Sequence, residues 1–330
     1  MQARSLPDID RRSFLGATAA LLLAPQVQAQ GGWPTARPID WIVPYPPGGS
    51  TDVLGRAVAQ LLATSLATPV IVDNKAGATG TIGGGFVAKA APDGFTVLGT
   101  SIGPQAIAPH LMHLPYDPLR DLQPVVTIGT IPHILVVGEK QPFKTVADLI
   151  AAAKAQPGRL SFASGGIGTI LQMQGEWLKQ QTGVSLIHVP YKGDTPALLD
   201  TLSNVVNFMF APAAAALPHV LAGKLRALAV TSAERLAALP NVPTMTQAGF
   251  RNFVVEQWQA VYLPARTPAA IVQRLNGDIN KALANAAVVD LARKLGVTLV
   301  GGTPQALQAT QVADSAKWAQ VIRDGHITAD

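Results

Sequence analysis

The stretch IDWIVPYPPGGSTD, residues 39–52, places a short apolar run before a loop with two adjacent glycines and three helix-capping residues. The residues after it repeat apolar side chains at helical spacing. We therefore expect a strand at 39–44 and a helix at 52–66. Gly48 and Gly49 in the loop between them let the backbone come close to a ligand.

The start of this helix is a candidate anion site. Ser50, Thr51 or Asp52 can cap it. The first N–H groups of a helix have no intrahelical acceptor, and the positive end of the helix dipole lies beside them, so a carboxylate or phosphate binds there readily. The alternative is an ordinary capped turn between strand and helix.

A second loop repeats this pattern. Residues 164–169, SGGIGT, also follow an expected strand and precede an expected helix. Leu171 stands where a dinucleotide fingerprint needs its third glycine, and no Gly-Lys-Ser/Thr follows as in a phosphate loop. Phe162 occupies a glycine position of the nucleophile elbow. Glycine-containing turns at 74–83 and 189–197 also lead into helix starts, so four such loops would surround one cleft.

Apolar runs alternate with helical patterns along the rest of the chain. The expected strands are 39–44, 70–72, 95–99, 133–137, 160–163, 186–189, 205–210, 225–230, 256–263 and, more weakly, 297–300. The expected helices are 52–66, 146–156, 170–181, one opened by Thr195 and Pro196, and most of 268–330. This alternation predicts an α/β fold with parallel-rich sheets covered by helices.

The length indicates two lobes, because 330 residues exceed one comfortable core. Two extended segments, near 130–133 and 252–258, are the expected crossovers. Lobe 1 would then contain residues 30–131 and 253–330, and lobe 2 residues 132–252. Both ends of the mature chain would lie in lobe 1.

Composition excludes several classes of protein. The chain is 48% hydrophobic and 14% charged, with a formal charge of +5, so it can bury a large core. Its basic residues are scattered, which disfavours a nucleic-acid partner. Cysteine is absent, which excludes disulfides and a thiol nucleophile. His110 and His113 share helical spacing without an accompanying glutamate, so we expect a surface pair, no metal site and no cofactor.

The N-terminus has the pattern of an export signal. Paired arginines, Arg11 and Arg12, precede an apolar stretch at 17–24 and small residues up to Ala29. The arginine pair resembles the twin-arginine type. The alternative is an anchor helix, but the apolar stretch is too short to span a membrane. We expect residues 1–29 to be removed near Ala29 and the mature protein to reach the periplasm without a lipid anchor.

Several motifs then occur in a familiar order. They are YPPGGSTD at 45–52, APDGFT at 91–96, LPYDP at 114–118, HVPYKG at 188–193, GKLRALAV at 223–230, LPNVPT at 239–244 and GGTP at 301–304. This set, spread over essentially the whole mature chain, resembles the Bug-type extracytoplasmic solute receptors of tripartite tricarboxylate transporters.

The resemblance implies a two-lobed periplasmic-binding-protein fold that closes on its ligand. It implies a small carboxylate held by backbone N–H groups, hydroxyls and waters, and two membrane subunits of a tripartite transporter as partners of a monomeric receptor. The expected ligand-binding residues are Tyr45, Pro47, Gly48, Gly49, Ser50, Thr51, Asp52, Thr79, Ser101, Ser164, Gly166, Gly168, Thr169, Tyr191, Asp194 and Ala211.

The chain departs from the family pattern at three positions near the expected cleft. Ala211 follows Phe210 where the family usually has aspartate, and Ile167 and Leu171 replace polar residues. We expect a more apolar pocket and a hydrophobic or aromatic monocarboxylate, rather than citrate or an acidic amino acid. The alternative is that these positions only pack the core.

The alternatives to a transport receptor are a sensor and a hydrolase. A receptor of this kind could present its ligand to a membrane kinase as a sensor instead of to a transporter. An exported hydrolase is disfavoured, because the sequence offers no recognisable pair of nucleophile and base. The protein is therefore expected to be a binding module and not an enzyme.

Overall fold

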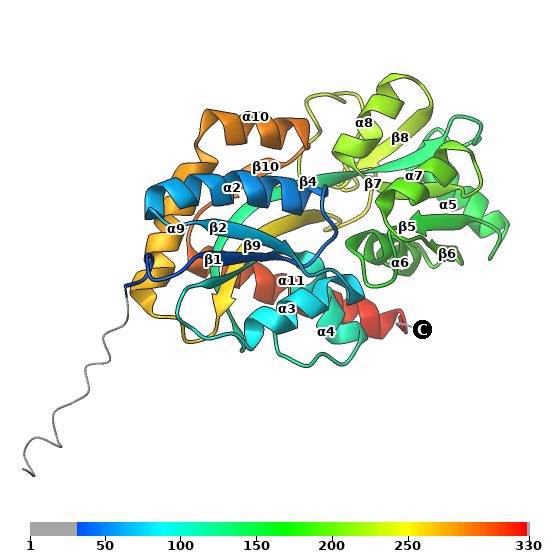
Figure 1. Ribbon diagram of the computed structural model, residues 1–330. Helices are drawn as coiled ribbons and strands as arrows, with labels where there is room; N and C mark the ends of the chain where they lie inside the picture. Colours follow the sequence, from blue (N-terminus) through cyan, green and yellow to red (C-terminus); the bar gives the residue numbers. More distant parts are fainter. Residues whose placement is uncertain (1–31, 329–330) are drawn as a thin grey trace, which may run out of the picture.

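The computed structural model describes residues 32–328 (Figure 1). The expected export signal, residues 1–29, lies outside the described residues. Within them, no helix is both long and apolar enough to cross a membrane.

A single mixed sheet organises the described chain, with the strand order β2-β1-β3-β9-β4-β7-β5-β6 and with β8 and β10 also paired to β4. The strands are β1 (Ile39–Val43), β2 (Val70–Asn74), β3 (Thr96–Ser101), β4 (Leu122–Gly138), β5 (Ser161–Ser164), β6 (Ile187–Pro190), β7 (Phe208–Pro212), β8 (Leu225–Val230), β9 (Glu256–Pro264) and β10 (Thr298–Gly301).

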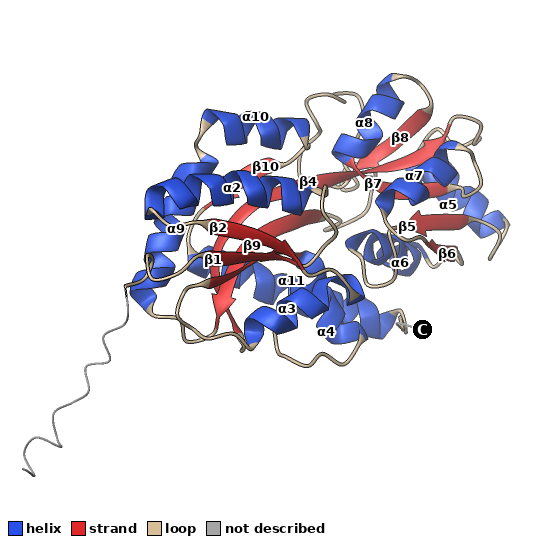
Figure 2. Ribbon diagram, viewed as in Figure 1, coloured by secondary structure: helices blue, strands red, loops and turns tan. Residues whose placement is uncertain are grey.

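Helices cover the sheet, as the colouring by secondary structure shows (Figure 2). They are α2 (Ser50–Leu66), α3 (Thr81–Ala88), α4 (Ala108–Leu111), α5 (Val146–Ala155), α6 (Ile170–Thr182), α7 (Asp194–Leu202), α8 (Ala213–Leu221), α9 (Ala269–Leu283), α10 (Ala286–Lys294) and α11 (Pro304–Asp324), with short helical turns η2 (Ala78–Gly80) and η3 (Gly103–Ile107).

The long strand β4 connects the two groups of strands in the sheet (Figure 1). Residues 122–132 pair antiparallel with β9, and residues 133–138 pair antiparallel with β7 and β8. We call β1, β2, β3, β9 and β10 the first half of the sheet, and β5, β6, β7 and β8 the second half; β4 belongs to both.

The α/β fold expected from the sequence is confirmed, but the sheet is mixed. The pairs β1–β2, β1–β3, β5–β6 and β5–β7 are parallel. Around β4 and β9 the pairs are antiparallel. The exact lobe boundaries remain a proposal, and the change of partners on β4 at residues 132–133 agrees with the crossover expected there.

The sequence pattern missed the first part of β4. The expected strand began at His133, whereas the observed one begins at Leu122. Its register against β9 shifts between Pro124 and Val126 and again between Thr127 and Gly129. Proline and glycine inside a strand mark such bulges and interrupt the alternation on which a sequence prediction relies.

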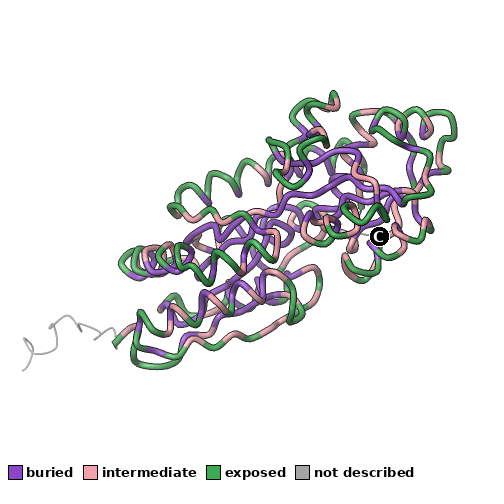
Figure 3. The backbone as a smooth tube through the Cα atoms, turned by 90° about the horizontal axis from the view of Figure 1, so that it is seen from above, coloured by how far each residue is buried: buried purple, intermediate pink, exposed green. Residues whose placement is uncertain are grey.

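The core follows the strands, which form the buried centre of the molecule (Figure 3). Helix α2 turns Leu54, Val58 and Leu62 inward, each essentially inaccessible to solvent. Each such side chain contributes about 1.5–3 kcal/mol of burial free energy. Helix α11 packs against β4, η3 and α6, so it joins both halves of the sheet.

The start of α7 differs from the expectation. Thr195 does not cap this helix, because the helix already begins at Asp194 with Gly193 as its N-cap. Gly193 has φ of 116°, a conformation that side chains rarely adopt, so the glycine rather than a capping hydroxyl sets where the helix starts. Asp194 is thereby placed in the first turn.

Candidate functional site

A pocket of about 270 Å³ lies between the two halves of the sheet. The first half contributes the loop after β1, the η2 turn and the end of β3, and the second half contributes the starts of α6 and α7. The lining residues are Tyr45, Gly49, Ser50, Thr51, Thr79, Ser101, Ile102, Gly103, Thr169, Ile170, Leu171, Asp194 and Gln257.

The start of α2 forms one wall. Gly49 is its N-cap, and the first intrahelical hydrogen bond runs from the Val53 N–H to the Gly49 carbonyl. The N–H groups of Ser50 and Thr51 therefore have no acceptor within the helix. A Cβ built on Gly49 would meet no atom within 4 Å, so the backbone here faces open space. This is the geometry of an anion site.

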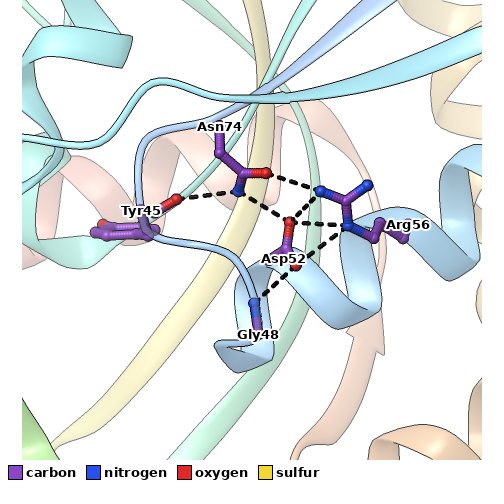
Figure 4. Close-up of polar contacts among 5 residues, drawn as sticks. All are labelled: Tyr45, Gly48, Asp52, Arg56 and Asn74. Carbon is purple, nitrogen blue, oxygen red and sulfur yellow. Dashed lines mark hydrogen bonds and ion pairs between the residues drawn. The ribbon is translucent and has the colours of Figure 1, made fainter.

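Asp52 does not line the pocket; it holds the loop that does (Figure 4). Its carboxylate accepts hydrogen bonds from the Gly48 N–H at 2.9 Å, from Asn74 Nδ2 at 2.9 Å and from Arg56 Nε at 3.1 Å. Asn74 also donates to the Tyr45 carbonyl at 3.0 Å. Burial alone would raise the pKa of Asp52, but these hydrogen bonds hold it below its usual value.

Two polar contacts fix the floor of the pocket. The hydroxyls of Tyr45 and Ser101 lie 2.6 Å apart. Gln259 Nε2 donates to Ser50 Oγ at 2.6 Å, and its Oε1 has no partner among the described residues. The sequence pattern did not lead to Gln257 and Gln259. Both lie on one face of β9, and two polar residues alternating within an apolar strand are a pattern that could have identified them.

The second half of the sheet supplies a loop held by its own side chains. Thr169 caps α6, accepting from the Gln172 N–H and donating to the Gly166 carbonyl at 2.7 Å. The Gly168 N–H donates to Gln172 Oε1 at 2.7 Å. Across the pocket, Thr79 Oγ1 donates to the Ile167 carbonyl at 3.3 Å, so the two halves touch beside the site.

Ser164 and His188 meet in the structure, with Ser164 Oγ 2.7 Å from His188 Nε2. The sequence did not reveal this pair. Ser164 is fully buried and does not line the pocket, so a substrate cannot reach its hydroxyl. Burial, with a smaller contribution from Lys179, lowers the pKa of His188 to about 4. The pair positions the loop at Gly166, to whose carbonyl Ser164 also donates.

Half of the expected ligand-binding residues line the pocket, namely Tyr45, Gly49, Ser50, Thr51, Thr79, Ser101, Thr169 and Asp194. The others lie behind or beside it. Pro47 and Gly48 are exposed, and Gly166 and Gly168 shape the loop before α6. These glycines, like Asp52 and Ser164, position the pocket without facing it.

Tyr191 and Ala211 point elsewhere. The Tyr191 hydroxyl donates to Asp200 Oδ2 at 2.6 Å, and burial followed by this hydrogen bond raises the pKa of Tyr191 to about 12. Ala211 is fully buried in β7 opposite Ile134 and packs the core. Of the three apolar departures, the structure places only Leu171 at the pocket, where Ile102 and Ile170 join it.

Asp194 is the charged side chain of the pocket. It opens α7, whose N-cap Gly193 donates its N–H to the Gly165 carbonyl at 3.1 Å. A Cβ on Gly165 would collide with Asp194 Oδ1, so the carboxylate lies directly over this glycine. Burial raises the pKa of Asp194 to about 6.

Residues 32–328 contain no group of three histidine, aspartate or glutamate side chains that could hold a metal ion. His110 Nε2 lies 2.8 Å from Ser315 Oγ, on a second pocket away from the site described above. The site is therefore composed of hydroxyls, helix-start N–H groups, the Gln257 carboxamide, three apolar side chains and one carboxylate.

Residues 54–327 match the family described as tripartite tricarboxylate transporter family receptor. Protein BugT of Bordetella pertussis is 41% identical over 88% of this chain and 89% of its own length. A Rhodopseudomonas palustris protein solved with adipate superimposes with a TM-score of 0.79 at 33% identity, covering 90% of this chain and 99% of that one. MatC of Rhodopseudomonas palustris, solved with malate, gives 0.77 at 28% identity over 87% and 99%.

Proposed function

The chain belongs to the tripartite tricarboxylate transporter receptor family, and from that premise we propose that it captures a small carboxylate in the pocket and delivers it to the membrane subunits of a tripartite transporter. Receptors of this family are periplasmic solute-binding proteins, not enzymes. The Bug-type resemblance of the sequence is confirmed by this match and by the relationship to BugT.

One observation carries the proposal. The starts of α2 and α6 meet at one pocket, where helix-start N–H groups and the hydroxyls of Ser50 and Thr51 are available as donors. Donors of this kind suit a carboxylate without needing a lysine or arginine. The adipate and malate bound to the two solved relatives are carboxylates as well.

The place of action follows from the N-terminal residues. The twin-arginine pattern before Ala29 supports export to the periplasm and cleavage there. A receptor in that compartment can reach the outer face of a membrane transporter. The delivery step is tested by uptake: cells that carry the two membrane subunits should accumulate the bound carboxylate only when this receptor is also present.

Calorimetric titration with a panel of mono-, di- and tricarboxylates tests the binding step. At least one carboxylate should bind, and Gly49→Val should abolish its binding because the new side chain would occupy the open space before the α2 N–H groups. The variant should remain folded, since Gly49 has φ of −72° and ψ of 164°, which valine readily adopts, although valine is a poorer N-cap than glycine and should cost about 1 kcal/mol.

Gly277→Val is the matched control, because Gly277 lies in α9, outside the pocket, and also has no atom within 4 Å of a built Cβ. It should bind like the unmodified protein. If no carboxylate binds, or if Gly49→Val retains full affinity, carboxylate capture at this pocket is refuted.

A further inference from the structure

The pocket has an unusual charge pattern for a carboxylate receptor. Among its lining residues within the described chain, Asp194 is the single charged side chain, and no lysine, arginine or histidine lines the pocket. The site therefore carries one negative charge at neutral pH and has no cation to balance it. A ligand with two carboxylates would add like charges to a half-buried acid.

Asp194 also differs from the buried acids elsewhere in residues 32–328. Asp52, Glu176 and Asp278 are each more than nine-tenths buried, and each forms an ion pair. The carboxylate of Asp194 accepts no hydrogen bond and forms no ion pair with any other described residue. An acid partly withdrawn from water without a partner lowers stability, and a bound cationic group reverses that loss.

The neighbouring backbone keeps this carboxylate at the pocket. Gly165 provides the space into which the side chain extends, and the hydrogen bond from Gly193 to Gly165 ties the start of α7 to the loop before α6. Asp194 therefore lies on the same side of the pocket as Thr169 and Leu171. A ligand held at the start of α6 would come within the reach of this acid.

Resting on the carboxylate-binding function proposed above, we propose that the ligand is a zwitterion, with a protonated nitrogen bound by Asp194 and a carboxylate bound by the helix starts. The ammonium group donates to an otherwise unpartnered carboxylate, and the complex becomes electrically neutral. Ile102, Ile170 and Leu171 pack against the carbon skeleton between the two charged groups.

This conclusion revises the expectation of an apolar monocarboxylate. That expectation depended on Ile167, Leu171 and Ala211, of which the structure places only Leu171 at the pocket. The apolar wall remains, but the sequence pattern gave no weight to an uncompensated acid beside it. The ligand class that fits both the apolar wall and the Asp194 carboxylate is an amino acid or amino carboxylate with an apolar carbon chain.

Four probes of similar length separate the alternatives by calorimetric titration at pH 7.5: hexanoate, adipate, 5-aminopentanoate and 2-aminohexanoate. At least one of the two amino compounds should bind about ten-fold or more tightly than hexanoate, as a hydrogen bond to a charged group allows. Adipate should bind less tightly than hexanoate. The nitrogen of 5-aminopentanoate lies at the end of the carbon skeleton distant from the carboxylate, and that of 2-aminohexanoate lies next to the carboxylate, so the two compounds test both placements of the cation.

Asp194→Asn should reduce the advantage of the amino compound to about three-fold or less and should strengthen adipate binding, while hexanoate affinity changes little. Retained hexanoate binding and an unchanged circular dichroism spectrum show that this variant is folded. Asp290→Asn is the control, because Asp290 is an exposed acid on α10, paired with Arg293 and remote from the pocket lining.

The outcomes distinguish the two proposals. Binding of hexanoate, adipate or another nitrogen-free carboxylate in preference to both amino compounds overturns the zwitterion while carboxylate capture stands. The zwitterion is also overturned, and carboxylate capture again stands, if Asp194→Asn leaves the order of the four affinities unchanged. If neither these probes nor the wider carboxylate panel bind, carboxylate capture itself fails.

Discussion

The Asp194→Asn variant should be more stable than the unmodified protein when no ligand is bound. Burial raises the pKa of Asp194 from 3.8 to about 6. At 1.36 kcal/mol per unit, this shift corresponds to about 3 kcal/mol of unfavourable free energy for the charged form. The same carboxylate favours the first turn of α7 through the helix dipole, by about 0.3–1 kcal/mol. With partial solvent access, we expect a net gain of about 1–2 kcal/mol.

The pH dependence of this stability difference follows from how tightly the folded and unfolded states bind the Asp194 proton. The folded state of the unmodified protein binds the Asp194 proton more tightly than the unfolded state. The contribution of Asp194 to stability is therefore most favourable below about pH 4, falls as pH rises from about 4 to about 6, and stays at its lowest value above that. Asparagine does not titrate, so the advantage of the variant should be near zero at pH 4 and fully present at pH 7.5.

Urea unfolding of both proteins at several pH values between 4 and 8 measures this difference, and thermal unfolding should show a rise of about 2–4 °C at pH 7.5. Asp290→Asn, on the surface of α10, should show no such pH-dependent gain. A variant less stable than the unmodified protein at pH 7.5, or a gain independent of pH, would refute the view that Asp194 is an unpartnered acid.

Arg56→Ala should cost about 1 kcal/mol at pH 7 and move acid unfolding to higher pH, because Asp52 has a lowered folded pKa whose stabilisation is lost as pH falls below about 4; urea and acid titrations measure both. Gly175→Ala should destabilise by about 1–3 kcal/mol in urea unfolding, since its Cβ would collide with the Phe162 ring; an unchanged midpoint contradicts this. Periplasmic protein should begin just after Ala29 by intact mass, and a mass that retains the leader rejects export with cleavage.

Regular elements were predictable because their residues alternate or repeat cleanly. The expected strand at 225–230 coincides with β8, and the helices at 146–156 and 170–181 differ from α5 and α6 by a single residue at one end. The first part of β4 was missed because Pro124 and Gly129 interrupt it at register shifts. A local sequence pattern predicts the bounds of a strand or helix well only where pairing with a distant strand does not introduce a bulge.

The sequence predicted those parts of the site that lie on loops with a recognisable residue pattern. Glycine and hydroxyl residues beside helix starts led to Gly49, Ser50 and Thr169, which do line the pocket. The partners that complete the site come from distant positions: Gln259 lies more than 200 residues from the Ser50 that it contacts. Whether Asp194 has a partner depends on what surrounds it in space, and a sequence pattern holds no such information.

The pairing of β9 also orders events during synthesis. Leu98 of β3 lies opposite Tyr262, and Gln123 of β4 lies opposite Leu263. While the ribosome is still making the last third of the chain, β3 lacks its final neighbour on one edge, and the first part of β4, which pairs with both β9 and β10, lacks its final neighbours on both edges. The second half of the sheet, complete by Val230, can close earlier. On the twin-arginine route proposed above, the chain folds before it leaves the cytoplasm, so those unfinished edges must be protected until the carboxyl-terminal segment has been synthesised.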